Sequence, residues 1–405
     1  MLRSNRSLRR LLGSWAQSCV GTGVGYVALL VLTIRYLHTS WAISAVLLAD
    51  FVPWIALGAW FGVCADRYSK RTLIVVSNVL QAGAWGGLTV AHTLVPILGL
   101  ALLAGVGNAM LRPALRSALP IIAGEATQTA VAWYDTCRWV GLTAGPLAAA
   151  GLFAVSGVGV PLALNGLSFL VAAVVMAGVR VDSPPHAEEH GHIGSGLRAG
   201  LAVAFSAPGI AAVIGCAAAQ FISGGLLNVC EPLLATKVLR GSSSDYALLV
   251  ACYGIGMVTA TLFVARRGRA SAATLVRRYL DALTLIAVGM FASAIVGSVL
   301  PATVAFAVTG YANALLLVSA TQLIQLRVPI AVQGRLFGAK DMLEGAGFLL
   351  GLLGAGALVA AAGVRVTLAA GAGICGVCAL TAIATVRLGR AAPVPPQGAG
   401  LEPLG

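Results

Sequence analysis

Three ionisable residues lie inside long apolar runs of this 405-residue chain, and they are the first candidates for chemistry. Asp50 lies near the middle of the run 42–63. Asp135 and Arg138 share one face of a helix at their spacing, so they could neutralise each other. Ionisable groups are costly in an apolar environment and often mark the path of an ion or proton. We therefore predict Asp50, Asp135 and Arg138 as proton-coupling residues. The alternatives are a structural Asp135–Arg138 pair and a structural contact of Asp50 with another helix.

The other reactive side chains do not form a recognisable catalytic or metal site. Cys375 and Cys378 form a CxxC pair, but they lie in an apolar run without a second ligand pair. Glu231 and Asp281 fall near the ends of apolar runs, where we expect them to reach the interface or cap a helix. No nucleophile–base arrangement and no ATP-binding loop is present. We therefore expect no enzymatic activity, no metal and no cofactor. His186, His190 and His192 cluster in a polar segment, where a solvated linker is favoured over a metal site.

The composition predicts that membrane-spanning helices position these residues. The chain is 59% hydrophobic and 10% charged, whereas soluble proteins are about 45–50% apolar and about 25% charged. A membrane span needs roughly 20 mostly apolar residues. Twelve such runs are expected, approximately at 11–34, 42–63, 72–92, 95–112, 129–154, 159–179, 209–232, 245–265, 279–299, 302–326, 337–361 and 366–386.

The distribution of the positive charges predicts the orientation in the membrane. The net charge is +13, but the Lys and Arg residues lie in short clusters between apolar runs, which excludes a nucleic-acid-binding domain. Positive loops are retained in the cytoplasm during insertion. With both termini in the cytoplasm, only Arg35, Lys237, Arg240 and Arg365 fall outside, and Arg138 falls within a span. We expect a multi-pass protein of the plasma membrane.

A polar segment divides the chain into two related halves. We expect one bundle over 1–180, a cytoplasmic linker with a short interfacial helix over 181–208, and a second bundle over 209–405. The halves resemble each other at a near-constant offset, which indicates duplication. Two six-helix halves around a central cavity form an architecture for alternating access. The matched residues include Gln17 with Gln220, Gly105 with Gly310, Asn108 with Asn313, Asp135 with Asp341 and Gly141 with Gly347.

The connection after the second run carries a loop motif. It reads Gly62-Val63-Cys64-Ala65-Asp66-Arg67-Tyr68-Ser69-Lys70-Arg71. This resembles the motif G-x-L-A-D-R-x-G-R-K of the major facilitator superfamily, with Cys64 and Ser69 as departures. The resemblance implies a latch that holds the two halves together in the outward-facing state. Its members would be Gly62, Asp66, Arg67, Lys70 and Arg71, with Asp341 and Glu344 as partners.

The fifth run carries a second motif, in which Gly145-Pro146 follows Gly141 at small-xxx-small spacing. It is similar to the G-x-x-x-G-P-x-x-G-G motif of proton-driven drug exporters, with Ala149 and Ala150 in place of the last glycines. The arginine that these exporters often carry in the fourth span is replaced by Ala101, and we expect Arg112 to be an interface anchor. The overall pattern most resembles the branch of macrolide and siderophore exporters.

The sequence thus predicts an all-α membrane protein with twelve transmembrane helices in two pseudo-symmetric six-helix bundles, acting as a monomer. We expect proton-coupled efflux of an amphipathic small molecule, with the proton gradient as the energy source. A dedicated siderophore or metabolite exporter, a lysolipid carrier, and a non-transporting membrane protein are the alternatives. The expected substrate cavity comprises Gln17, Tyr26, Asn108, Gln220, Asn313 and Gln322, although each could instead form a hydrogen bond between helices.

Overall fold

The computed structural model describes residues 5–37, 39–179, 181, 208–267, 270–328 and 330–391. Within these ranges the chain forms helices and short connections, without a strand. The elements are α1 (Arg6–Leu37), α2 (Ser40–Arg67), α3 (Lys70–Leu88), α4 (Leu94–Ala123), η1 (Gly124–Ala126), α5 (Thr127–Val155), α6 (Gly159–Ala177), α8 (Pro208–Leu233), the π-helical turn η2 (Leu234–Val238), α9 (Ser243–Arg267), α10 (Ala272–Ile295), α11 (Val299–Arg327) and α12 (Ile330–Ala391).

Polar residues between the apolar runs set the helix starts. The Thr39 hydroxyl accepts a hydrogen bond from the Ala42 N–H at 3.3 Å, and the Ser69 hydroxyl accepts one from the Thr72 N–H at 3.4 Å. Such caps satisfy the free N–H groups of the first helical turn. The helix α12 bends at Gly363, whose φ of 84° is accessible to glycine at no steric cost. This bend lies between the two predicted runs 337–361 and 366–386.

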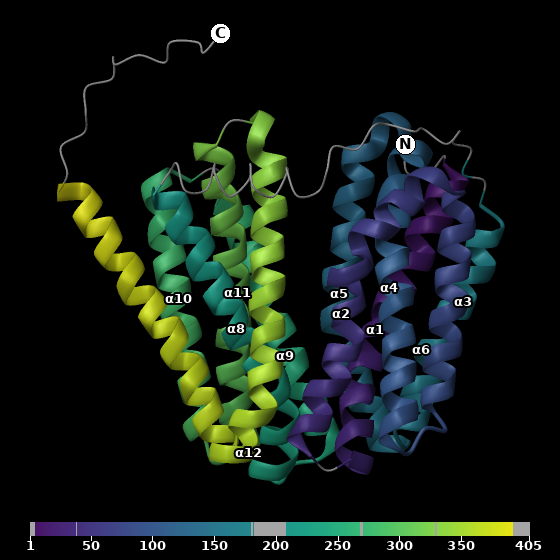
Figure 1. The fold of residues 1–405 in the computed structure, drawn as a ribbon, viewed down its shortest axis with the longest axis horizontal. Helices are drawn as coiled ribbons and strands as arrows, with labels where there is room; N and C mark the ends of the chain where they lie inside the picture. Colours follow the sequence, from purple (N-terminus) through teal and green to yellow (C-terminus); the bar gives the residue numbers. More distant parts are fainter. Residues whose placement is uncertain are drawn as a thin grey trace.

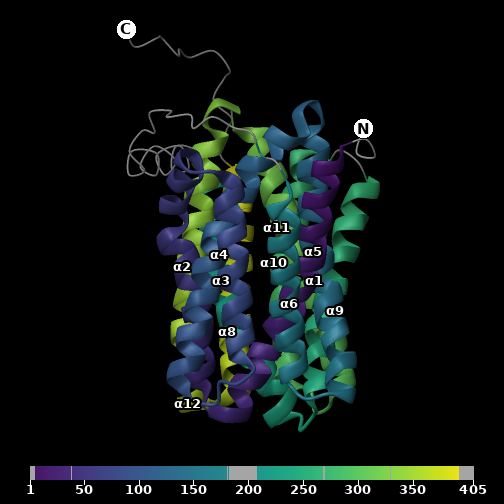
Figure 2. The ribbon, with the colours of Figure 1, turned by 90° about the vertical axis from the view of Figure 1, so that its right-hand side faces the viewer.

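The helices form two groups that lie side by side (Figure 1). One group contains α1 to α6 and the other contains α8 to α12. The groups meet at one end of the molecule, which we call the closed end, and separate toward the other, which we call the terminal end because α1 begins and α12 ends there. Figure 2 shows the helices running along one common direction. The predicted boundaries at 180 and 208 stay predictions, and the expected interfacial helix lies outside the described residues.

Ten helices within the described ranges are long and apolar enough to cross a membrane. The predicted span 72–92 corresponds to α3, which is not among them because its inner face carries the buried polar residues Ser77, Asn78 and Gln81. The two last predicted spans are joined in α12 and count once. The expected number of twelve therefore stays a prediction, while the all-helical membrane fold is confirmed.

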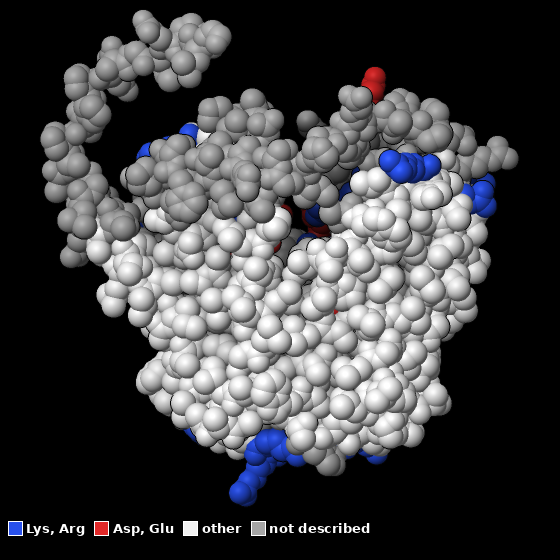
Figure 3. Space-filling model, viewed as in Figure 1, with Lys and Arg blue, Asp and Glu red and all other residues white. Residues whose placement is uncertain are grey.

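The outer surface is apolar around the middle of the molecule (Figure 3). Large hydrophobic side chains near the middle of their helices, such as Leu350, Leu167 and Val140, are exposed at 59%, 53% and 50%. Lys and Arg side chains gather toward the two ends. A belt of this kind matches the hydrocarbon core of a bilayer, which would cover these side chains.

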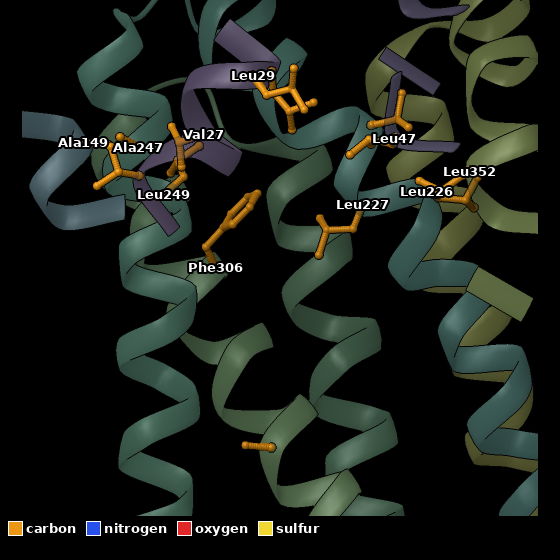
Figure 4. Close-up of a cluster of buried hydrophobic side chains, with 14 of the residues drawn as sticks. Val27, Leu29, Leu47, Ala149, Leu226, Leu227, Ala247, Leu249, Phe306 and Leu352 are labelled. Carbon is orange, nitrogen blue, oxygen red and sulfur yellow. The ribbon is translucent and has the colours of Figure 1, made fainter. Parts of the chain in front are cut away.

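The two groups are joined near the closed end by buried apolar side chains (Figure 4). Leu29 and Leu47 come from the first group, whereas Leu227, Phe306 and Leu352 come from the second. We call this set the apolar plug. A polar contact accompanies it, since the Ser40 hydroxyl donates to the Gly356 carbonyl at 3.1 Å. These contacts hold the two groups together near the closed end.

Candidate transport cavity

A cavity of about 90 Å³ lies in the first group, on the side that faces the second group. We call it the transport cavity. Figure 3 shows a hollow between the two groups at the terminal end, with acidic and basic atoms at its bottom. Drug-sized ligands need about 300–1,000 Å³, so a large substrate must also occupy the space between the groups. The lining residues include Trp15, Cys19, Thr22, Tyr26, Asp50, Gln81, Trp85, Asn108, Arg112, Arg138 and Phe169.

Asp50 and Arg112 both line this cavity, and their opposite charges attract each other. Asp50 lies on α2, where α2 and α4 approach so closely that a Cβ on Gly105 would overlap the Asp50 carbonyl oxygen. Arg112 lies on α4, and its Nε donates to the Asn108 Oδ1 at 3.1 Å. Its guanidinium also stacks over the Trp54 ring, 5.0 Å from the centroid. The position of Arg112 corrects the expected interface anchor, because α4 continues beyond the predicted run and places the residue inside the bundle.

The structural pair of Asp135 with Arg138, one of the two alternatives from the sequence, is not formed in this structure between these two described side chains. Both side chains are half-buried on α5, but no ion pair joins them among the described side chains. Arg138 lines the transport cavity and lies over the Trp139 ring, 5.4 Å from the centroid. Two arginines and one acid therefore share this cavity, and neither arginine forms an ion pair with a described carboxylate.

The closed-end wall of the transport cavity contains Tyr26. Its hydroxyl donates to the Asn228 Oδ1 of α8 at 2.5 Å, so it links the two groups. Asn228 is held in turn by a bond from its Nδ2 to the Gly224 carbonyl at 2.8 Å. Tyr26 thus belongs both to the cavity wall and to the contact between the groups.

The second group has a related polar set, in which Tyr253 takes the place of Asp50. A Cβ on Gly310 would overlap the Tyr253 carbonyl, just as one on Gly105 would overlap that of Asp50. The Asn313 Nδ2 contacts the Tyr253 hydroxyl at 2.5 Å, and the Gln220 Nε2 donates to the Asn313 Oδ1 at 3.4 Å. Gly105 and Asn108 on α4 thus occupy positions equivalent to those of Gly310 and Asn313 on α11, as the sequence match predicted.

Two other residues predicted for the cavity have different surroundings. The Gln17 Nε2 donates to the Ser168 carbonyl of α6 at 2.7 Å and to the Ser14 carbonyl at 3.1 Å, so this side chain joins helices. Gln322 is half-buried on α11. Neither lines the transport cavity. Their assignment to the substrate cavity stays a prediction.

The predicted latch residues lie at the terminal end, and none of those whose side chains are described forms an ion pair or hydrogen bond across the groups. The helix α2 runs to Arg67, so only Tyr68 and Ser69 separate it from α3. Arg71 donates to the Ala177 carbonyl of α6. Glu344 binds Lys340 of its own helix at 2.7 Å, and Asp341 lies 3.9 Å from the same lysine. The Asp66 side chain lies outside what the structure describes.

The glycine motif of α5 packs against α1. A Cβ on Gly145 would lie 2.5 Å from the Gly23 Cα, and one on Gly141 would lie 2.5 Å from the Cys19 carbonyl carbon. In the second group Gly351 of α12 has the same relation to Gly225 of α8, at 2.9 Å. Small residues thus allow the backbones to touch at equivalent crossings. The motif is a packing device in this state.

Comparison with known families agrees with this architecture. A family model described as transmembrane secretion effector matches residues 8–397. An uncharacterized MFS-type transporter of Mycobacterium tuberculosis is 26% identical over 376 residues, which cover 84% of each chain. Macrolide efflux protein A of Streptococcus pyogenes is 22% identical over 172 residues, which cover 41% of this chain and 42% of that protein.

Solved structures show the same fold. The nucleoside transporter NupG superposes with a TM-score of 0.73 at 15% identity, over 94% of this chain and 99% of that one. A bacterial homolog of the human lysosomal transporter Spinster superposes with a TM-score of 0.72 at 15% identity, over 96% of this chain and 97% of that one. At this identity the likeness concerns the fold.

Proposed function

Because the chain belongs to the transmembrane secretion effector family of major facilitator transporters, we propose that it exports amphipathic small molecules across the cell membrane in exchange for protons. A transporter of this type works by alternating access. The helices α1 to α6 would rock against α8 to α12, so that the cavity opens to each side in turn. Export of amphipathic compounds is supported by the local likeness to a macrolide efflux protein.

One observation carries this proposal. The transport cavity is closed at one end by the apolar plug, and its wall holds Asp50 and Arg112 among aromatic side chains. Aromatic and apolar walls with few polar groups suit amphipathic compounds. A carboxyl group at this place can bind and release a proton, which changes the charge of the cavity and favours one of the two states.

The orientation follows from the positive charges. We infer that the terminal end faces the cytoplasm, because Arg67, Arg71 and Arg116 lie exposed there. In the state described here the cavity would then face inward. The latch residues would meet Asp341 or Glu344 after the terminal end closes, which fits the lack of such an ion pair among the described side chains in this state.

The test uses the purified protein in liposomes with an imposed proton gradient and a panel of amphipathic compounds. We expect gradient-dependent movement of at least one compound, reduced about tenfold in Asp50→Asn, which corresponds to ~1.4 kcal/mol in the barrier. Asp281→Asn is the matched control, since Asp281 is 60% exposed and lies 3.8 Å from Arg277 on the same helix. If no compound moves under a gradient, the exporter proposal is wrong. Full gradient-driven transport in Asp50→Asn would remove only its coupling role.

A second candidate function is favoured by the two arginines of the cavity. Arg112 and Arg138 repel each other, and Asp50 is the one carboxylate among the residues that line this cavity. A charge inside a membrane protein is strongly stabilised by a partner of opposite sign. An anionic substrate, such as a siderophore, a metabolite with a carboxylate, or a lysolipid, would supply that partner. A dedicated exporter of such an anion is therefore the alternative.

A further inference from the structure

A buried carboxyl group of the second group has no role in the site described above. Glu231 lies near the end of α8, and only 6% of its surface is exposed. Among the described side chains no Lys, Arg or His lies within 4.0 Å of its carboxyl oxygens. Among the described side chains, the Tyr246 hydroxyl is the one that donates to this carboxyl group, with 3.4 Å to Oε1. A buried carboxylate without a cation is costly, whereas the neutral acid is much less so.

The groups around Glu231 offer no compensating charge. Tyr246 and Tyr253 face it from α9, Tyr26 faces it from α1, and Cys230 precedes it on α8. Phenols and thiols are ordinarily uncharged at neutral pH. Within the described residues, no charged group of the other helices that pack against α8 acts on the Glu231 carboxyl. Lys237 follows on η2, but its side chain is exposed.

Glu231 lies between the apolar plug and the closed end. Leu227 belongs to the plug (Figure 4), and Glu231 lies one turn further along α8 toward the closed end. A second cavity, of about 470 Å³, opens at the closed end between α1 and α5 on one side and η2 and α9 on the other. Thr236 lines that cavity and donates to the carbonyl of Pro232, the residue after Glu231, at 2.7 Å. The plug thus separates Glu231 from the terminal end, while only a short segment separates it from the closed-end cavity.

A contact between the groups lies one turn of α8 from Glu231. Asn228 accepts the hydrogen bond from Tyr26 and lies on the turn of α8 that precedes Glu231. When the closed end opens, this bond must break and the plug must separate, so water reaches this turn. Tyr26 also lines the transport cavity together with Asp50, and both carboxyl groups act on its hydroxyl. Tyr26 therefore lies between an acid of each group.

We propose that Glu231 is a second binding site for the coupling cation, a proton, which it takes up from the closed-end side and holds while that end is closed. This proposal rests on the proposed function and deepens it. With the closed end open, the Glu231 carboxylate accepts a proton from water and becomes the neutral acid. Closure then buries this acid behind the Tyr26–Asn228 bond. The proton leaves when the surroundings of Tyr26 loosen toward the transport cavity. Proton binding at Glu231 thus favours the state described here.

The first test is infrared spectroscopy of the full chain in liposomes at neutral pH. We expect an absorption band of a protonated carboxyl group that disappears in Glu231→Gln and remains in the matched control Asp281→Asn. Tyr246→Phe removes the hydrogen-bond donor, so it should shift the band without abolishing it. This second variant keeps the test valid if Glu231→Gln does not fold. A spectrum of the native protein without such a band, or one unchanged in Glu231→Gln and Tyr246→Phe, would refute the proposal.

The second test separates coupling from substrate binding. We expect Glu231→Gln to lose about tenfold or more of the substrate movement driven by a proton gradient, while exchange of substrate at equal pH stays within about twofold. A merely structural role would lower both rates together, and this outcome would overturn the proposal. A sodium gradient that drives the native protein but not Glu231→Gln would also overturn it, because the site would then bind sodium.

The two proposals fail in different ways. If the native protein shows no proton-driven transport but the carboxyl band is present and is lost in Glu231→Gln, the proton site stands and the proposed exchange function fails. If proton-driven transport is present and Glu231→Gln retains it, the exporter stands and the role of Glu231 fails.

Discussion

Two arginine side chains line the transport cavity without an ion-pair partner among the described carboxylates. The guanidinium of Arg112 is held by one neutral side chain, Asn108, and by the face of Trp54. Arg138 has Trp139 beside it and forms no ion pair with a described carboxylate. Both groups therefore keep donors available for an anion. A hydrogen bond to a charged group contributes about 1.5–3 kcal/mol.

This leads to a prediction about substrate charge. Two compounds with the same aromatic body should be compared, one with a carboxylate and one with its neutral ester. If the anion is the substrate, Arg112→Gln and Arg138→Gln should each weaken its binding about tenfold or more, and should change binding of the ester little. Binding is measured by titration calorimetry, with Arg277→Gln as the exposed control. Equal effects on both compounds would mean that the arginines do not recognise the negative charge of the substrate. Recognition of a lipid headgroup can be tested in the same way with a series of lysolipids.

The sequence identified some of these residues and missed others for a physical reason. Asp50 is the only acidic residue in its apolar run, and the high free-energy cost of a charge inside the membrane made it a candidate. Arg112 and Glu231 lie at the ends of apolar runs, where charge is ordinarily solvated. The helices do not stop there: α4 continues to Ala123, and α8 passes into η2, which ends at Val238. Hydropathy reports where a run ends, but tertiary packing decides how far the helix continues.

At the scale of elements, the α1–α5 crossing depends on glycine. The backbone of α5 at Gly145 contacts the backbone of α1 at Gly23, and the space between them is too small for a side chain. The sequence motif predicted this close packing from spacing alone. It could not predict that Pro146 also lies against Gly23, since that requires the register of α1 against α5.

We predict that Gly145→Val destabilises the protein, because overpacking in a close contact costs about 1–3 kcal/mol. The midpoint of thermal unfolding in detergent should fall by several degrees, and transport should fall with it. Gly151→Val is a matched control on the same helix, because a Cβ there has open space. An unchanged midpoint in Gly145→Val would show that α1 and α5 can separate without loss.

On the scale of the whole molecule, the two groups touch at the closed end and part at the terminal end. The repeated relations of Gly105 with α2 and Gly310 with α9 show that the two groups pack alike at this helix crossing. The proposed rocking of the two groups would preserve this crossing in each group and change the contacts between the groups. The repeated residues in the sequence predicted two related halves. They could not predict which end of the molecule is closed, because that depends on contacts between the halves.

The predicted latch can be tested by a substitution of one of its proposed partners. Asp341 is 72% exposed and only weakly paired with Lys340, so it remains available for a basic residue of the first group. Asp341→Asn should remove that partner and slow turnover about three- to fivefold, as expected for a partly exposed ion pair of about 1 kcal/mol. The thermal midpoint of the state described here should not fall. Turnover is measured in liposomes with Asp281→Asn as the control, and a native rate in Asp341→Asn would assign the latch to other residues.

The bend at Gly363 has a practical consequence. The helix α12 reverses its direction at the closed end through this one residue of positive φ. The two arms of α12 are therefore connected there without a loop. An epitope inserted there would have to distort both arms of α12. The connection 239–242 between η2 and α9 carries exposed residues instead, and it is the better position for an antibody site that reports which face of the membrane the closed end occupies.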